Sequence, residues 1–125
     1  MTNDSRYVDA FGMHRRQWRD YRTSTGNRPV RDFIMGLPLG DKQEIAAAMK
    51  EVALDGLEAS RHVRGDIYEV RADGKDRTYR ILFAPLGRFN QILLALEGFT
   101  KKTQKTPPDR IALAEARLAD WRERG

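Results

Sequence analysis

The sequence between residues 67 and 83 constrains the fold more than any other stretch. Apolar and polar side chains alternate in residues 67–71 and again in residues 77–83, and Asp73-Gly74 lies between the two segments. Alternation with a period of two is typical of β-strands that bury one face, and Asp-Gly favours a tight hairpin turn. We therefore expect two antiparallel strands joined by a short loop.

The predicted pairing of these strands separates apolar from charged side chains. If residues 73–76 form the loop, Ala72 pairs with Arg77, and Glu69 lies opposite Arg80. The apolar face of the hairpin would then consist of Tyr68, Val70, Tyr79, Ile81 and Phe83. The opposite face would carry Glu69, Arg71 and Arg80.

An apolar segment at residues 91–98 predicts a third strand beside the hairpin. With residues 85–90 as the connecting loop, Phe83 faces Ile92, and Leu94 and Leu96 join the apolar face. The same register adds three residues to the charged face, namely Leu93, Glu97 and Phe99.

Three segments have the apolar spacing of amphipathic helices. Residues 29–37 and 41–56 repeat apolar side chains at intervals of three and four, and Asp41 followed by Glu44 resembles a capping box. Thr106 is the predicted N-cap of a third helix, whose apolar stripe is Ile111, Ala114, Leu118 and Trp121.

These elements predict one α+β domain over residues 17–125. It would contain a small antiparallel or mixed sheet, an N-terminal helix pair on one sheet face and a C-terminal helix. Trp18 and Tyr21 favour a first strand within residues 17–23. Residues 1–16 are polar and lack clean periodicity, which predicts an N-terminal arm with one short helical turn near residues 7–11.

The composition excludes several classes of site and protein. The chain has no Cys, which excludes disulfides and thiolate-based zinc sites. No apolar run approaches the ~20 residues that a membrane span needs, and no apolar signal-peptide segment follows the N-terminus. We therefore expect a soluble, cytoplasmic protein without a membrane partner.

Positive charge is concentrated directly after the third predicted strand. Residues 100–110 contain four cations and one acid, a net charge of +3 (4 − 1), whereas the whole chain has +5. Clustered cations gain affinity for nucleic acids because they displace counterions from phosphates. The segment therefore predicts contact with a polyanion; the alternative is a solvated loop without a ligand.

The chain lacks the motifs of most hydrolytic enzymes. Its His, Asp and Glu residues do not have metal-ligand spacing, no Gly-rich phosphate loop follows a strand, and no Ser lies in a nucleophile motif. We expect neither a metal nor a cofactor. RNA, however, supplies its own nucleophile, the 2′-hydroxyl, so that an enzyme needs only to position the backbone, stabilise charge and transfer protons.

Five residues are candidates for this chemistry. Arg71 and Arg80 would clamp the scissile phosphate, and Glu69 would act as a base or orient an arginine. Lys101 or Lys102, crowded by neighbouring cations, would assist proton transfer. The alternative for Glu69 and Arg80 is an ordinary cross-strand ion pair.

Four more residues are candidates for RNA binding. Phe99 or Tyr79 would stack on an exposed base, and Thr103 and Lys105 would hold the flanking backbone. The alternative for both aromatic residues is a place in the core, and the pairing above puts Tyr79 on the core face.

Three stretches of the chain resemble the HigB-type toxins of the RelE superfamily. They are residues 67–71, residues 79–83 and, as the most specific, residues 98–108 followed by Ile111 and Ala114. The resemblance covers roughly Trp18 to Glu123, and the expected elements follow the order of that fold.

The resemblance implies a RelE-like toxin that enters the ribosomal A site, cuts the mRNA there and is neutralised by a helix-turn-helix antitoxin. The family's functional basic residues fall on Arg71, Arg80, Lys101 and Lys102, with Glu69 beside them. Several members place a His near the active site where this chain has none. Members usually begin just before the first strand, which makes Met13 an alternative start.

A non-catalytic or gyrase-poisoning member of the same superfamily is the alternative function. Gyrase-poisoning relatives lack a cluster of basic and acidic residues on the sheet, whereas this chain is predicted to have one.

Overall fold

The hairpin expected from the alternating stretches lies at the centre of a five-stranded sheet. The computed structural model describes residues 16–124. The hairpin strands are β3 (Ile67–Asp73) and β4 (Thr78–Leu86), and β5 (Ile92–Thr100) lies antiparallel to β4. β1 (Gln17–Asp20) pairs in parallel with β5, which gives the strand order β1-β5-β4-β3-β2 and makes the sheet mixed.

The outermost strand, β2 (Arg61–Arg64), is not among the strands that the sequence pattern predicted. Its four residues contain one apolar side chain, and it pairs with β3 at only three positions across an irregular register. Such a short, charged edge strand lacks the alternation of apolar and polar side chains from which strands are predicted.

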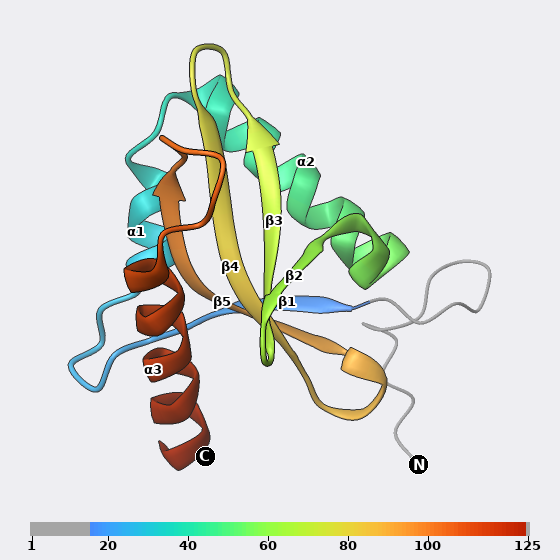
Figure 1. Cartoon of the computed structure of the whole chain (residues 1–125), viewed down its shortest axis with the longest axis vertical. Coiled ribbons are helices and arrows are strands. Elements are labelled where there is room, and N and C mark those ends of the chain that lie inside the picture. The colour runs from blue at the N-terminus through green and yellow to red at the C-terminus, as the bar shows by residue number, and fades with distance from the viewer. Residues whose placement is uncertain (1–15, 125) are drawn as a thin grey trace.

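Helices cover both faces of the sheet (Figure 1). α1 (Pro29–Met35) and α2 (Leu39–Asp55) pack on one face, which confirms the expected N-terminal helix pair, and α3 (Pro108–Arg124) packs on the other. Short 3-10 helices occur at Leu57–Ala59 and Arg88–Asn90. No helix in residues 16–124 is long and apolar enough to cross a membrane.

Two hydrophobic clusters, one on each face, hold these layers together. The cluster under α1 and α2 contains Val30, Ile45, Val52, Val70, Ala72, Tyr79, Ile81, Phe83, Leu93 and Ala95. The cluster under α3 contains Tyr21, Ile67, Leu82, Ala84, Leu94, Leu96, Phe99, Ala114 and Leu118. Because both faces are covered, β4 and β5 are buried over most of their length.

The pairing of β3 with β4 differs from the predicted register by two residues. Arg71 lies opposite Arg80, and Ala72 lies opposite Tyr79 rather than Arg77. Side chains alternate with a period of two, so a shift by two leaves every side chain on its predicted face. The predicted separation of Glu69, Arg71 and Arg80 from the apolar face is therefore confirmed.

A β-bulge makes part of the β5 prediction wrong. Leu82 lies opposite Glu97, but Phe83 lies opposite Ala95, so Leu96 is the extra residue. From Leu96 back towards the start of β5, each side chain lies on the face opposite to the predicted one. Leu94 and Leu96 pack under α3, and Leu93 packs under α1 and α2. After the bulge, towards the end of β5, Glu97 and Phe99 lie on the same face as Arg80, as predicted.

Asp41 does not cap α2, which begins at Leu39 after Pro38. Its buried carboxylate instead accepts hydrogen bonds from the Tyr79 hydroxyl and from the Lys75 backbone N–H, the latter at 3.1 Å. These two hydrogen bonds, led by that from Tyr79, hold the pKa of Asp41 below its ordinary value. They connect α2 to the β3–β4 hairpin.

The predicted N-terminal arm lies, apart from its last residue, outside the described residues, as does the short helical turn expected near residues 7–11. The last residue of that segment, Arg16, donates its backbone N–H to the Ala53 carbonyl at 3.2 Å.

Gly98 is the position where a methyl group would disturb the core most directly. A Cβ at Gly98 would lie 2.7 Å from a ring carbon of Phe33 and 3.0 Å from Cδ1 of Ile81. We expect Gly98→Ala to lower the free energy of unfolding by about 1–3 kcal/mol in urea titrations, because overpacking forces the core to shift.

The matched control is Gly40→Ala in α2, where nothing lies within 4 Å of the added Cβ. This change should be neutral or stabilise by up to about 1 kcal/mol, since Ala favours the helix. Equal stabilities of the two variants would contradict the packing described here.

Candidate active site

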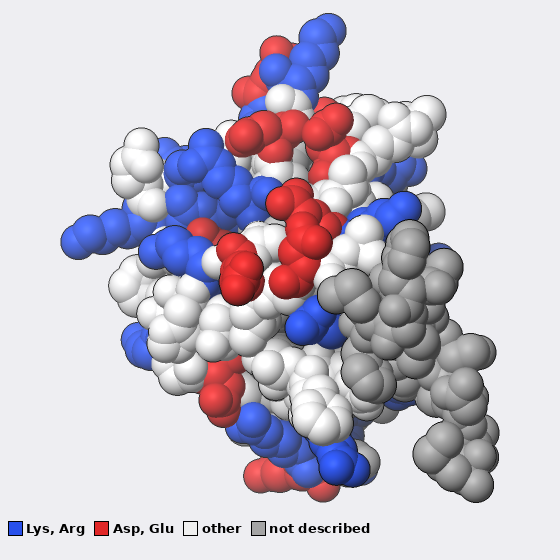
Figure 2. Space-filling model, turned by 90° about the vertical axis from the view of Figure 1, so that its right-hand side faces the viewer, with Lys and Arg blue, Asp and Glu red and all other residues white. Residues whose placement is uncertain are grey.

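Strands β3, β4 and β5 bring the predicted acidic and basic residues together on the face that also carries α3. Glu69 and Arg71 come from β3, Arg80 from β4, and Glu97 and Phe99 from β5. The connection between β5 and α3, residues 101–107, passes in front of the sheet (Figure 1). Figure 2 shows Lys and Arg side chains gathered at the upper left, on the side that faces the viewer in Figure 1.

A buried ion pair forms the floor of this region. Glu69 and Arg80 are each only 4% exposed, and Arg80 Nη1 donates to Glu69 Oε2 at 3.3 Å. Arg80 Nη1 also donates to the Thr106 hydroxyl at 2.8 Å, and Nη2 donates to the Gln104 carbonyl at 2.7 Å. The Thr106 hydroxyl in turn donates to Glu69 Oε2. The ion pair therefore fastens the 101–107 connection to the sheet.

Arg61 on β2 completes this buried network. Its Nη2 donates to Glu69 Oε1 at 3.2 Å and to the Thr106 hydroxyl at 3.1 Å. The Glu69 carboxylate thus accepts three hydrogen bonds while nearly excluded from water. Two roles were predicted for Glu69, a base or a residue that orients an arginine. These contacts favour the second role, because a base would need access to solvent and substrate.

Above the network lies a pocket of about 410 Å³, called the basic pocket below. Four of the five predicted catalytic residues line it; its lining is Ala59, Ser60, Arg61, Glu69, Arg71, Arg80, Lys101 and Gln104. Lys102, the fifth, is exposed and does not line this pocket. Arg71 is 55% exposed and makes a loose ion pair with Asp73 at 3.5 Å.

Lys101 is the lysine that lines this pocket. Its backbone N–H donates to the Thr78 carbonyl at 2.7 Å, which fixes the residue at the end of β5. Partial burial, followed by the charges of Arg71 and Arg80, holds the pKa of Lys101 below its ordinary value. A lysine in such a position loses its proton more readily and is suited to proton transfer.

Glu97 and Phe99 hold α3 against the sheet. Glu97 accepts hydrogen bonds from Arg110 at 2.7 Å and from Arg117 at 3.2 Å. The Phe99 ring is 5% exposed, and the Arg110 guanidinium lies 5.3 Å from its centroid. A base that stacks directly on Phe99 would therefore have to displace Arg110.

Tyr79 is not part of this site. It lies on the opposite face of the sheet, is 1% exposed and donates its hydroxyl to Asp41. The sequence prediction that it faces the core is confirmed, and its ring is not accessible for stacking on a base. Thr103 and Lys105 are exposed in the 101–107 connection.

Sequence reasoning missed two residues of the buried network. Arg61 was overlooked because the sequence pattern predicted no strand at residues 61–64. Thr106 was expected to cap α3, but its hydroxyl is engaged by Glu69, Arg80 and Arg61, and the helix begins at Pro108. No local pattern marks either contact, since both join residues distant in the sequence.

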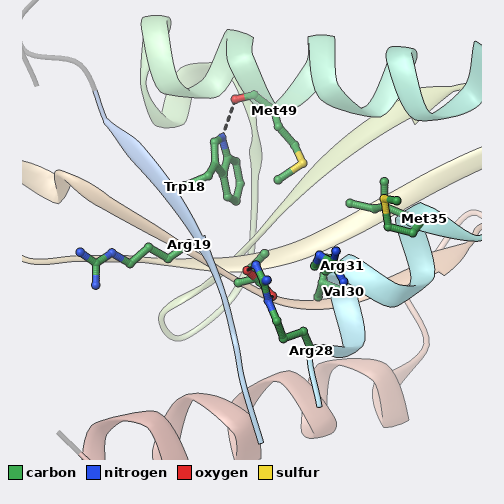
Figure 3. A pocket seen from close by; sticks show the side chains of 10 residues that line it. Trp18, Arg19, Arg28, Val30, Arg31, Met35 and Met49 are labelled. Carbon is green, nitrogen blue, oxygen red and sulfur yellow. Dashed lines mark hydrogen bonds and ion pairs between the residues drawn. The ribbon is translucent and has the colours of Figure 1, made fainter. Parts of the chain in front are cut away.

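A different pocket, of about 320 Å³, lies beside β1 and is mostly apolar (Figure 3). The Trp18 indole there donates to the Met49 carbonyl at 2.7 Å, and Arg28 is held by two hydrogen bonds to Asp20. Arg19 points away from the cavity (Figure 3). The acid of this pocket, Asp20, is bound by Arg28, and the rest of the lining is mostly apolar, so the basic pocket is the better candidate for phosphate chemistry.

The chain is similar to known proteins over most of its length. The family described as phage derived protein Gp49-like (DUF891) matches residues 32–119. Two proteins of Mycobacterium tuberculosis, from strains CDC 1551 / Oshkosh and ATCC 25618 / H37Rv, are each 32% identical to the chain over 109 residues. Each is named "Probable endoribonuclease HigB1", and the similarity covers 84% of the chain and 84% of each relative.

The buried pair can be tested by a double-mutant cycle. Glu69→Leu and Arg80→Met should each lower the free energy of unfolding by about 3–5 kcal/mol, because each leaves an unpaired buried charge. The double variant should cost at least about 1 kcal/mol less than the sum of the two. Urea titration measures all three values.

The control pair is Asp66 and Arg122, whose ion pair at 3.1 Å is exposed. Replacing either residue by Ala should change the free energy of unfolding by no more than about 1 kcal/mol. Additive effects at Glu69 and Arg80 would show that the two charges are not coupled.

Proposed function

Because the chain belongs to the Gp49-like family of phage-derived proteins, we propose that it is an endoribonuclease toxin of a toxin–antitoxin pair. The observation that carries this proposal is the position of Lys101 and Arg71 above the buried Glu69–Arg80 pair in one basic pocket. The M. tuberculosis relatives, which are named as probable endoribonucleases, support the same activity.

In the proposed reaction, the 2′-hydroxyl of the RNA attacks the adjacent phosphate. A bond forms between phosphorus and the 2′ oxygen, and the bond from phosphorus to the 5′ oxygen of the next nucleotide breaks. Lys101, in its neutral form, accepts the proton of the 2′-hydroxyl. The departing 5′ oxygen takes a proton from a second donor, for which Lys102 is the candidate.

The arginines have different roles in this proposal. Arg71 and Arg61 are more than half exposed and line the basic pocket, so their guanidinium groups are available to the phosphate. Arg80 lines the same pocket, but its two Nη groups are bonded to Glu69, Thr106 and Gln104. We therefore assign Arg80 the stabilisation of charge and the positioning of the loop, and Glu69 the orientation of both Arg80 and Arg61.

We further propose that the substrate is mRNA in the ribosomal A site and that a helix-turn-helix antitoxin neutralises the protein. The +3 charge of residues 100–110 supports binding to a polyanion. No metal is required by the proposed steps, since the nucleophile belongs to the RNA and cations of the chain face the phosphate. Action on translating mRNA would place the protein in the cytoplasm.

Cleavage of mRNA on programmed ribosomes tests the activity. Lys101→Ala should lower the single-turnover rate by about 10²–10⁴-fold, the usual contribution of a proton-transfer group. Lys50→Ala, which changes an exposed lysine of α2, should leave the rate unchanged.

Intact mRNA together with growth arrest and DNA damage would contradict the endoribonuclease proposal and point to gyrase. Normal cleavage by Lys101→Ala would contradict the role of this lysine.

The pH dependence of cleavage tests the protonation state of Lys101. Below its pKa the amine is protonated and cannot accept a proton, so the rate should rise with pH and level off above that pKa. Because the pKa of Lys101 is lowered, the plateau should begin below the ordinary lysine value of about 10.4. Lys101→Arg should abolish this rise; a rate that falls with pH in the same range would make Lys101 an acid instead.

A further inference from the structure

A second pocket lies on the other side of Lys101, and we propose that it binds the nucleotide next to the scissile phosphate. This loop pocket has a volume of about 290 Å³ and is lined by Phe99, Thr100, Lys101, Lys102, Thr103, Lys105, Pro107 and Arg110. Lys101 lines both this pocket and the basic pocket. The inference rests on the proposed function, because it assigns a place to a second part of the same RNA.

The loop pocket carries positive charge that the protein does not neutralise. Lys102 and Lys105 are exposed, and neither forms an ion pair within residues 16–124. Arg110 is the cation of this pocket that is held by an acid, Glu97, at 2.7 Å. Two unpaired lysines beside one another are suited to a phosphate group, which accepts charge-assisted hydrogen bonds from such cations.

The same pocket offers a flat surface for a base. The Arg110 guanidinium lies over the Phe99 ring, and its ion pair with Glu97 fixes it there. Nucleic acid bases stack on arginine planes as well as on aromatic rings. A base would therefore lie against Arg110, with Phe99 beneath it, while Lys105 contacts the phosphate that flanks this nucleotide and Lys102 remains available as the proton donor.

The 101–107 connection is held at several points, so the pocket exists before RNA binds. The Lys101 backbone is bonded to Thr78, and the Thr103 hydroxyl donates to the Lys105 carbonyl at 2.8 Å. The Thr106 hydroxyl anchors the other end of the connection to Glu69. The volume is near the lower limit of about 300 Å³ for small-molecule sites, which suits one nucleotide rather than a longer segment.

Shared lining by Lys101 makes the two pockets neighbouring subsites. A phosphate in the basic pocket and the adjacent nucleotide in the loop pocket would lie on either side of the same lysine. The loop pocket would thus determine which phosphate of a bound strand reaches Lys101.

Titration of the full-length, isotope-labelled protein with mononucleotides tests this inference by NMR. The probes are 5′-AMP and 5′-UMP, which cannot be cleaved, with inorganic phosphate and adenosine as separate arms. The nucleotides should shift the signals of the Lys102 to Lys105 amides and the Phe99 ring, and should bind more tightly than phosphate or adenosine. Lys105→Ala should weaken nucleotide binding about 10–100-fold, the effect of losing one charge-assisted contact.

Lys105→Arg should restore most of the nucleotide affinity, and Lys50→Ala should leave it unchanged. Inorganic phosphate that binds as tightly as the nucleotides would overturn the inference, since the base would then make no contact. Equal affinity of the wild type and Lys105→Ala would overturn it as well.

Cleavage kinetics separate this inference from the proposed function. Lys105→Ala should weaken the binding of RNA more than it slows cleavage. The RNA concentration that gives half of the maximal single-turnover rate should therefore rise by a larger factor than the maximal rate falls. Cleavage without nucleotide binding in the loop pocket would overturn the subsite alone. Nucleotide binding without any cleavage would overturn the endoribonuclease proposal while supporting the subsite.

Discussion

The ion pair between Glu69 and Arg80 is the interaction on which the site depends. Both side chains are almost excluded from water, and the cost of removing such charges from water is offset only when their hydrogen-bonding groups are satisfied. Arg61, Thr106 and the Gln104 carbonyl supply partners for the Glu69 oxygens and for both Arg80 Nη groups, whereas the buried Arg80 Nε has no hydrogen-bond partner within residues 16–124. These partners come from β2 and from the β5–α3 connection, so satisfying the buried pair also fixes the elements around it.

This arrangement explains how a short, lysine-rich connection forms two pockets. Thr106 and Gln104 hold the connection down on the sheet, while Lys101 is fixed at the end of β5. Lys101 therefore lines both the basic pocket and the loop pocket, and its partial burial, followed by the charges of Arg71 and Arg80, lowers its pKa. The proposed chemistry combines this lysine with exposed arginines, while the buried charges serve to position them.

Sequence patterns predicted the parts of the fold that depend on local periodicity. The hairpin, the helix pair and the common face of Glu69, Arg71 and Arg80 followed from alternation, and the error of two residues in register left that face unchanged. The bulge at Leu96 reversed part of β5, because one extra residue inverts the alternation without leaving a local signal. Arg61 and Thr106 were missed since their contacts are set by tertiary packing across 8 and 37 positions of the chain.

The most direct test of this account is the single-turnover cleavage rate of Thr106→Val, measured at saturating RNA on programmed ribosomes. Val keeps the shape of Thr but lacks the hydroxyl that joins the connection to Glu69 and Arg80. We expect a folded variant whose rate falls by about tenfold or more, because Lys101 and its neighbours lose their positions. A rate equal to that of the wild type would contradict the central claim that the buried network positions the site.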